Sequence, residues 1–226
     1  MTIIWSNLVL KQASNIACAC ASLLLIAVPI AESRDVTVMV VDGKGAPVQD
    51  AVVTLTPAAG GKKPAPTNSE ITQASQEFTP LVAIIPVGSR VRFPNKDNVA
   101  HHVYSFSPVK KFDLPLYTGE ESEAVIFDRP GVVKLGCNIH DWMVAHLFVT
   151  DTAWFGLSEK SGRVILRQVP AGTASLEIWH PRLKGNPVQV ALAADENGPV
   201  NVQLDMRPDF KRRRAPGAGD AAGGYQ

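Results

Sequence analysis

The chain has 226 residues, a formal net charge of +1 and 19% charged residues. This length is sufficient for one large or two small domains with hydrophobic cores, and the near-neutral charge gives no electrostatic basis for binding nucleic acid. Valine, glycine and proline are spread along the chain, and no long amphipathic helix or internal repeat is evident. We therefore expect an all-β protein of short strands separated by turns.

Residues 1–33 have the features of a secretory signal peptide. A positive charge at Lys11 precedes an apolar run from Ile16 to Ile30, and small residues follow this run. An uncleaved membrane anchor is the alternative, but the apolar run is shorter than the roughly 20 residues that a span requires. Cys18 and Cys20 also permit a lipoprotein cleavage, although apolar sequence continues beyond both. We expect cleavage, a periplasmic or otherwise extracytoplasmic location, and no stable membrane insertion afterwards.

Two β-rich segments follow in residues 34–68. Val36–Val41 and Ala51–Thr56 flank the turn-forming residues Asp42–Gly45, which predicts a β-hairpin over residues 36–56. The remainder, residues 57–68, is rich in proline, alanine, glycine and lysine, and this composition indicates a loop.

In residues 69–150, short apolar segments alternate with turns, which is typical of an antiparallel β-sandwich. The expected strands are Phe78–Pro86, Arg90–Phe93, Val99–Ser107, Ala124–Phe127, Val132–Leu135 and Val144–Thr150. Residues 151–206 contain further β-segments, including Gly162–Leu166 and Ser175–Trp179. Residues 207–226 contain four consecutive basic residues and few apolar ones, so we expect a disordered basic tail.

Cleavage of the signal leaves Cys137 as the single cysteine of the mature chain. It has no partner for an internal disulfide, so it is a buried thiol, an intermolecular bridge or a metal ligand. It begins the segment Cys137-Asn138-Ile139-His140-Asp141-Trp142-Met143, which places a thiolate, an imidazole and a thioether where a strand meets a loop. Two histidines, one cysteine and a weak axial methionine are the ligands of a type 1 (blue) copper site.

The required second histidine comes from His101 or His102. Neighbouring residues of a strand point to opposite faces of the sheet, so only one of the two faces the metal, and the expected register favours His101. Zinc is a weaker candidate than copper because a thioether is a poor ligand for it. A purely structural buried thiol is the remaining alternative.

These motifs carry a resemblance to the cupredoxins of the plastocyanin and amicyanin kind, from about Ile71 to Thr150. The similar segments are Phe78-Thr79-Pro80 through Asn95-Lys96-Asp97, then His101-His102-Val103, and finally Pro130-Gly131 through Cys137, His140 and Met143. The same segments are similar to plastocyanin-like proteins often labelled methylamine utilization proteins.

The resemblance implies a Greek-key β-sandwich with one type 1 copper ion bound by His101, Cys137, His140 and Met143. Relatives usually have asparagine at the position of His102, where it joins the two ligand loops; here His102 must do so, or the ligand identity shifts by one residue. Around the ligands we expect supporting roles for three residues: His102, Asn138, whose hydrogen bonds fix the loop, and Trp142, which shields the metal or packs beside it.

The flanking segments, residues 34–68 and 151–206, resemble the two ends of a carboxypeptidase-regulatory-like (transthyretin-like) sandwich. This resemblance implies that the cupredoxin domain, residues 69–150, is inserted into a smaller split β-sandwich. The alternative is that the flanks add strands to the cupredoxin itself.

The expected function is one-electron transfer to and from a redox partner protein, without enzymatic activity, because the His-x-His pairs of copper oxidases are absent. Copper storage or delivery is an alternative that predicts exposed clusters of methionine or histidine, which the sequence lacks. A metal-free periplasmic scaffold or adhesion module is the other alternative.

Overall fold

The structure, a computed structural model, describes residues 32–119, 123–196 and 198–208, and every regular element among them is a β-strand. The all-β prediction is confirmed. No helix capable of crossing a membrane occurs in these described ranges. All but the last two residues of the predicted signal peptide, and all but the first two residues of the predicted basic tail, lie outside the described residues.

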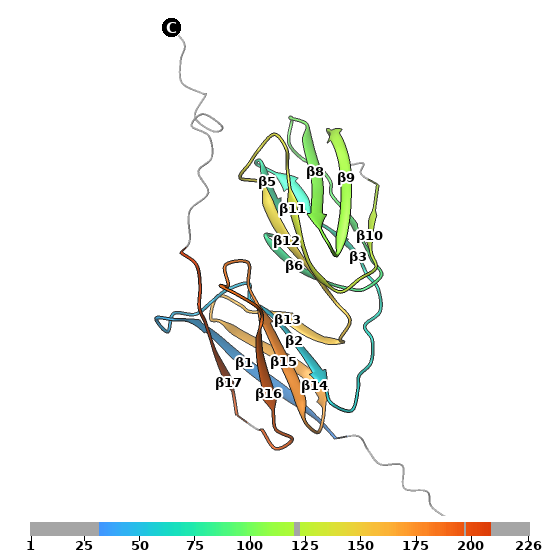
Figure 1. Cartoon of the computed structure of the whole chain (residues 1–226). Coiled ribbons are helices and arrows are strands. Elements are labelled where there is room, and N and C mark those ends of the chain that lie inside the picture. Colours follow the sequence, from blue (N-terminus) through green and yellow to red (C-terminus); the bar gives the residue numbers. More distant parts are fainter. Residues whose placement is uncertain (1–31, 120–122, 197, 209–226) are drawn as a thin grey trace, which may run out of the picture. The chain divides into compact units, whose positions relative to one another are not determined.

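Strands from both ends of the described chain pair with each other in two sheets (Figure 1). One sheet has the order β14–β1–β17 and the other has the order β13–β2–β15–β16. Their bounds are β1 (Ser33–Asp42), β2 (Val52–Pro57), β13 (Trp154–Leu157), β14 (Arg163–Pro170), β15 (Ala174–Trp179), β16 (Val188–Leu192) and β17 (Val200–Leu204). Inward-facing residues of both sheets, such as Val38, Leu55 and Leu176, form one apolar core.

The predicted hairpin over residues 36–56 is wrong, because β1 and β2 belong to different sheets. β1 is antiparallel to β14 and parallel to β17, whereas β2 lies between β13 and β15. The turn itself is present: the Asp42 carboxylate accepts hydrogen bonds from the backbone N–H groups of Lys44 (2.8 Å) and Ala46 (2.9 Å). Two β-rich segments beside a turn do not determine their pairing when both edges of the first strand have other partners.

Residues 68–150 form a second set of sheets (Figure 1). A five-stranded sheet has the order β6–β12–β11–β8–β9, a three-stranded sheet has the order β10–β7–β3, and β4 and β5 form a hairpin. Their bounds are β3 (Asn68–Glu70), β4 (Thr72–Ala74), β5 (Glu77–Thr79), β6 (Val82–Pro86), β7 (Ser89–Arg92), β8 (His101–Ser107), β9 (Lys110–Tyr117), β10 (Val125–Phe127), β11 (Gly131–Gly136) and β12 (Val144–Thr150).

The core of this second set is built from alternating residues of its strands, with Phe93 and Phe127 fully buried. Sequence analysis missed β9, which lies at the edge of the five-stranded sheet. Lys111 and Asp113 occupy its exposed positions, and charged residues are common on edge strands because they oppose pairing with other chains. Strands β1 and β2 thus belong to the first set of sheets, β3 to β12 form the second set, and β13 to β17 belong to the first set again.

Candidate metal centre

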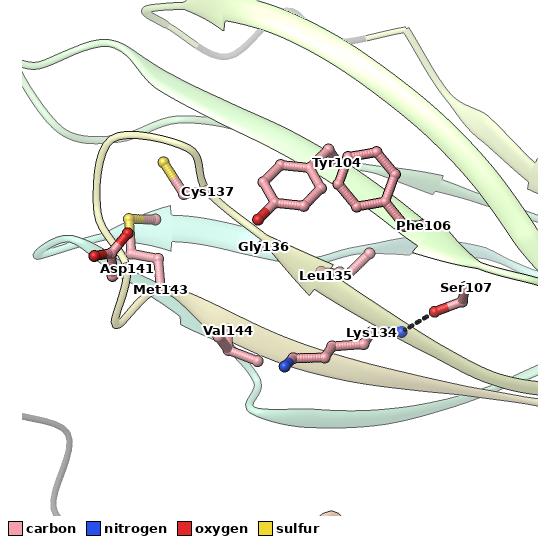
Figure 2. A pocket seen from close by; sticks show the side chains of 10 residues that line it. All are labelled: Tyr104, Phe106, Ser107, Lys134, Leu135, Gly136, Cys137, Asp141, Met143 and Val144. Atoms are coloured by element: carbon pink, nitrogen blue, oxygen red, sulfur yellow. Dashed lines mark hydrogen bonds between the residues drawn. The ribbon is translucent and has the colours of Figure 1, made fainter.

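The segment Cys137–Met143 is the loop that joins β11 to β12. The Cys137 N–H group donates to the Met143 carbonyl oxygen (3.3 Å), and the Met143 N–H group donates to the His140 carbonyl oxygen (2.9 Å). These two hydrogen bonds fold the loop back on itself, so that its first and last residues are neighbours. Both Cys137 and Met143 are buried, and Figure 2 shows their side chains on the same loop.

Three predicted ligands converge at this loop. His101 is the first residue of β8, the strand next to β11 in the five-stranded sheet. The Nδ1 atoms of His101 and His140 are 3.1 Å apart, and the His140 Nδ1 atom is 3.9 Å from the Cys137 Sγ atom. One donor atom from each of the three side chains lies within 4.8 Å of the other two. Met143, 1% exposed, belongs to the same apolar cluster as Cys137.

His101 and His102 face opposite sides of β8, as alternation along a strand requires. His101 is fully buried and lies in the cluster of donor atoms. His102 instead places its Nε2 atom 2.6 Å from the Asp113 Oδ1 atom on β9. The geometry therefore places His101, and not His102, beside Cys137 and His140.

The spacing of the donor atoms suits a first-row metal ion. Such ions take imidazole nitrogen at about 2.0 Å and thiolate sulfur at about 2.3 Å. In a trigonal plane, these bond lengths separate two nitrogen atoms by about 3.5 Å and nitrogen from sulfur by about 3.7 Å. The corresponding distances here are 3.1 and 3.9 Å. Imidazole, thiolate and thioether together form the donor set of copper sites, so the residues fit copper.

A carboxylate determines the tautomer of His101. The Asp97 Oδ2 atom lies 2.8 Å from the His101 Nε2 atom. Because an ionised carboxylate only accepts hydrogen bonds, Nε2 carries a proton, and Nδ1 is the ring nitrogen that faces His140. Burial raises the pKa of Asp97. Hydrogen bonds from the backbone N–H group of Gln76, the His101 side chain and the backbone N–H group of Ser75 outweigh this effect, so the pKa lies below its ordinary value. Asp97 is therefore ionised at neutral pH.

His140 is kept neutral by its surroundings. Burial, followed by the nearby His101, lowers the pKa of His140 below its ordinary value, while Asp97 acts in the opposite direction. A histidine binds a metal ion through a neutral ring nitrogen, so a lowered pKa reduces competition from protons. Asp97 was not among the residues predicted for the site. Its signals in the sequence were its place in the Asn95-Lys96-Asp97 segment, on which the resemblance to cupredoxins partly rests, and its position in a turn four residues before His101.

Of the three residues predicted to support the ligands, only Trp142 has a ring contact with one of the predicted ligands in the described part of the chain. The Trp142 Nε1–H group donates to the Gln76 carbonyl oxygen (3.1 Å), and its ring centroid is 5.1 Å from that of His140. Asn138 is exposed, and its side chain makes no hydrogen bond within the described residues. His102 contacts Asp113 and the Tyr104 ring, and so does not join the two ligand loops.

A pocket of about 440 Å³ lies beside the loop on the outer side of the five-stranded sheet (Figure 2). Its lining includes Cys137 and Met143, together with the neighbouring rings of Tyr104 and Phe106. Phe106 is 73% exposed. Gly136 is necessary for this arrangement, because a Cβ atom there would lie 2.9 Å from the Tyr104 ring. The absence of that side chain allows Tyr104 to cover the strand immediately before Cys137.

No family model and no curated protein matches the sequence. The similar solved structures include cupredoxins. A purple cupredoxin from Nitrosopumilus maritimus is 26% identical, with a TM-score of 0.33, over 36% of this chain and 99% of its own. An amicyanin variant in the Cu(I) form is 19% identical, with a TM-score of 0.33, over 43% of this chain and 98% of its own.

A copper-containing nitrite reductase from Thermus scotoductus SA-01 is 24% identical, with a TM-score of 0.35, over 42% of this chain. This chain matches only 25% of the reductase. In each of these three comparisons, the match covers less than half of the present chain.

Proposed function

We propose that residues 69–150 bind one copper ion as a type 1 site, and that the protein is an exported one-electron carrier. The proposed ligands are His101, Cys137, His140 and Met143. The observation that supports this proposal most directly is the convergence of two imidazole nitrogens and one thiol sulfur within 4.8 Å. This donor set favours copper over harder metal ions, which prefer carboxylate and carbonyl oxygen.

Bound copper would supply the Cu(I)/Cu(II) couple, and the protein residues would hold its surroundings constant. His101 is held by β8, and the Cys137–Met143 loop is closed by its own backbone hydrogen bonds. Ligands fixed in this way move little when the charge of a bound ion changes, which favours fast electron transfer. Four protein donors also leave no open position of the kind that catalytic metal sites keep for a substrate.

We also propose the division of the remaining chain. Residues 34–68 and 151–206 would form a split accessory sandwich of carboxypeptidase-regulatory-like type, a proposal supported by the pairing of β1 with β14 and of β2 with β15. Residues 1–33 would direct export and then be removed. The functional partner would be a redox protein, and neither nucleic acid nor a membrane is expected to bind stably.

Copper reconstitution of the mature protein, residues 34–226, tests the proposal. We expect one copper ion per chain and an intense visible band from charge transfer between the Cys137 thiolate and Cu(II), with a matching electron paramagnetic resonance signal. Cys137→Ala should lose the band and keep the circular dichroism spectrum of the fold. A colourless, copper-loaded protein would favour storage or delivery instead. A folded protein that binds no copper would favour a metal-free scaffold.

A further inference from the structure

Asp97 connects the first histidine of the proposed site to a distant hairpin. One carboxylate oxygen, Oδ2, lies 2.8 Å from the His101 Nε2 atom and also accepts the Gln76 backbone N–H group (2.8 Å). The other oxygen, Oδ1, accepts the Ser75 backbone N–H group (2.6 Å). A carboxylate with three such partners has a fixed orientation, and it fixes the orientation of the His101 ring in turn.

The hairpin turn that binds Asp97 has an unusual backbone. Ser75 and Gln76 form the two-residue loop between β4 and β5, and both have positive φ angles, 53° and 57°. Two-residue loops with this conformation usually contain asparagine and glycine, for which positive φ costs less. In this conformation both backbone N–H groups of the loop donate to the Asp97 carboxylate. The carboxylate therefore compensates for an unfavourable turn.

The same turn also reaches the second ligand segment. The Gln76 carbonyl oxygen accepts a hydrogen bond from Trp142 Nε1 (3.1 Å), and the Trp142 ring lies against the His140 ring. The backbone N–H group of Gln76 is thus bonded to Asp97, which holds His101. The backbone carbonyl of Gln76 is bonded to Trp142, which lies against His140. One residue of the hairpin joins the two segments through its backbone alone.

We propose that Asp97 and Trp142, connected through the backbone of Gln76, are positioning residues that hold His101 and His140 in their facing arrangement. This inference rests on the proposed copper function. It also answers a question raised by His102, which occupies the position where relatives carry the asparagine that joins the ligand loops. His102 is bonded to Asp113 instead. The connection is therefore made by a different route, through the β4–β5 hairpin.

The charge of Asp97 gives the connection a consequence for redox chemistry. A carboxylate hydrogen-bonded to a ligating imidazole makes the imidazole more basic, and this stabilises Cu(II) more than Cu(I). Loss of such a partner typically weakens metal binding by about 10- to 100-fold. If Cu(I) binding is unchanged, a loss of that size in Cu(II) affinity raises the reduction potential by about 60 to 120 mV, at 59 mV per tenfold change.

Two pairs of matched variants test the proposal on the copper-loaded protein. Asp97→Asn removes the charge beside His101, and Asp113→Asn removes an equivalent carboxylate beside His102. Trp142→Phe removes the indole donor to Gln76. Its control, Trp154→Phe, removes an indole bond of equal length (3.1 Å) to the carbonyl of Gln168, a residue that also has positive φ.

The measurements are the Cu(II) dissociation constant, the reduction potential and the visible spectrum. We expect Asp97→Asn to weaken Cu(II) binding about 10- to 100-fold and to raise the potential. Trp142→Phe should weaken Cu(II) binding about 3- to 10-fold, the usual value of one hydrogen bond, and should shift the visible band. Both control variants should match the wild type in all three measurements.

The outcomes separate this inference from the proposed function. A wild-type protein that fails to bind copper overturns both. A blue wild type with unchanged potentials and spectra in Asp97→Asn and Trp142→Phe overturns the positioning role and leaves the copper site intact. A change in reduction potential in Asp113→Asn that equals the change in Asp97→Asn also overturns the positioning role. If Asp97→Asn does not fold, as judged by circular dichroism, the test of the positioning role is the comparison of Trp142→Phe with Trp154→Phe. Equal Cu(II) binding and equal visible spectra in these two variants would overturn the role.

Discussion

Replacement of Gln76 by glycine should stabilise the apoprotein, although Gln76 lies at the centre of the proposed connection. Only the backbone of this residue bonds to Asp97 and Trp142, and glycine retains both backbone groups. The side chain contributes a buried amide oxygen, Oε1, that lacks a hydrogen-bond partner within the described residues. The native residue also has a φ angle of 57°, which glycine adopts without a steric penalty.

The expected gain follows from four contributions to the free energy of unfolding. Relief of the left-handed conformation is worth about 1–2 kcal/mol, and removal of an unsatisfied buried oxygen about 1–3 kcal/mol. The greater chain entropy of glycine in the unfolded state opposes these by about 0.5–1 kcal/mol, and the lost contacts of the side chain reduce the sum further. A net gain of about 1–2 kcal/mol would raise Tm by about 2–8 °C for a protein of this size.

Urea and thermal unfolding of the apoprotein measure this gain, with Gln168→Gly as the control. Gln168 has a similar φ angle, 53°, but its side chain is exposed, so only the backbone contribution applies. The difference between the two variants therefore isolates the buried oxygen of Gln76. Equal stabilities for Gln76→Gly and Gln168→Gly, or a loss of stability in Gln76→Gly, would refute the reasoning. The visible spectrum of the copper form should not change.

Three further predictions concern single side chains. His102→Asn should keep the blue band and His101→Asn should lose it; the reverse result would make His102 the ligand. The pKa of Asp97 is lowered from 3.8 in the folded protein, so its contribution to stability is complete above about that pH and is lost as the pH falls below it, through the lower pKa of the folded state. Urea unfolding of the apoprotein between about pH 5 and 2 should therefore be more pH-dependent in the wild type than in Asp97→Asn, and equal slopes would contradict this. Gly162→Ala should destabilise the protein by about 2–5 kcal/mol, because φ is +77° and the new Cβ would lie 2.3 Å from a backbone carbonyl oxygen. Urea unfolding measures this loss against Gly172→Ala, which has positive φ but no atom within 4 Å of the new Cβ; an equal loss in both would show that the close contact contributes nothing.

The sequence alone determined the features that depend on residues close together in the chain. Alternating apolar residues and frequent turns predicted the β-strands, because a strand buries every second side chain. The same alternation along β8 separated His101 from His102, and the structure places them on opposite sides as expected. The spacing of Cys137, His140 and Met143 predicted one loop that carries three candidate donors, because seven consecutive residues cannot separate far.

Contacts between distant segments were decided only by the tertiary structure. β1 pairs with β14 and β17, and not with β2, because strand pairing depends on which edges the whole fold leaves available. The partners of Asp97 could not be predicted from the sequence, since they include the backbone amides of Ser75 and Gln76, and every residue except proline carries such an amide. A hydrogen bond to a backbone group leaves no mark in the identity of the partner residue. Such contacts become visible only when folding brings the two segments together.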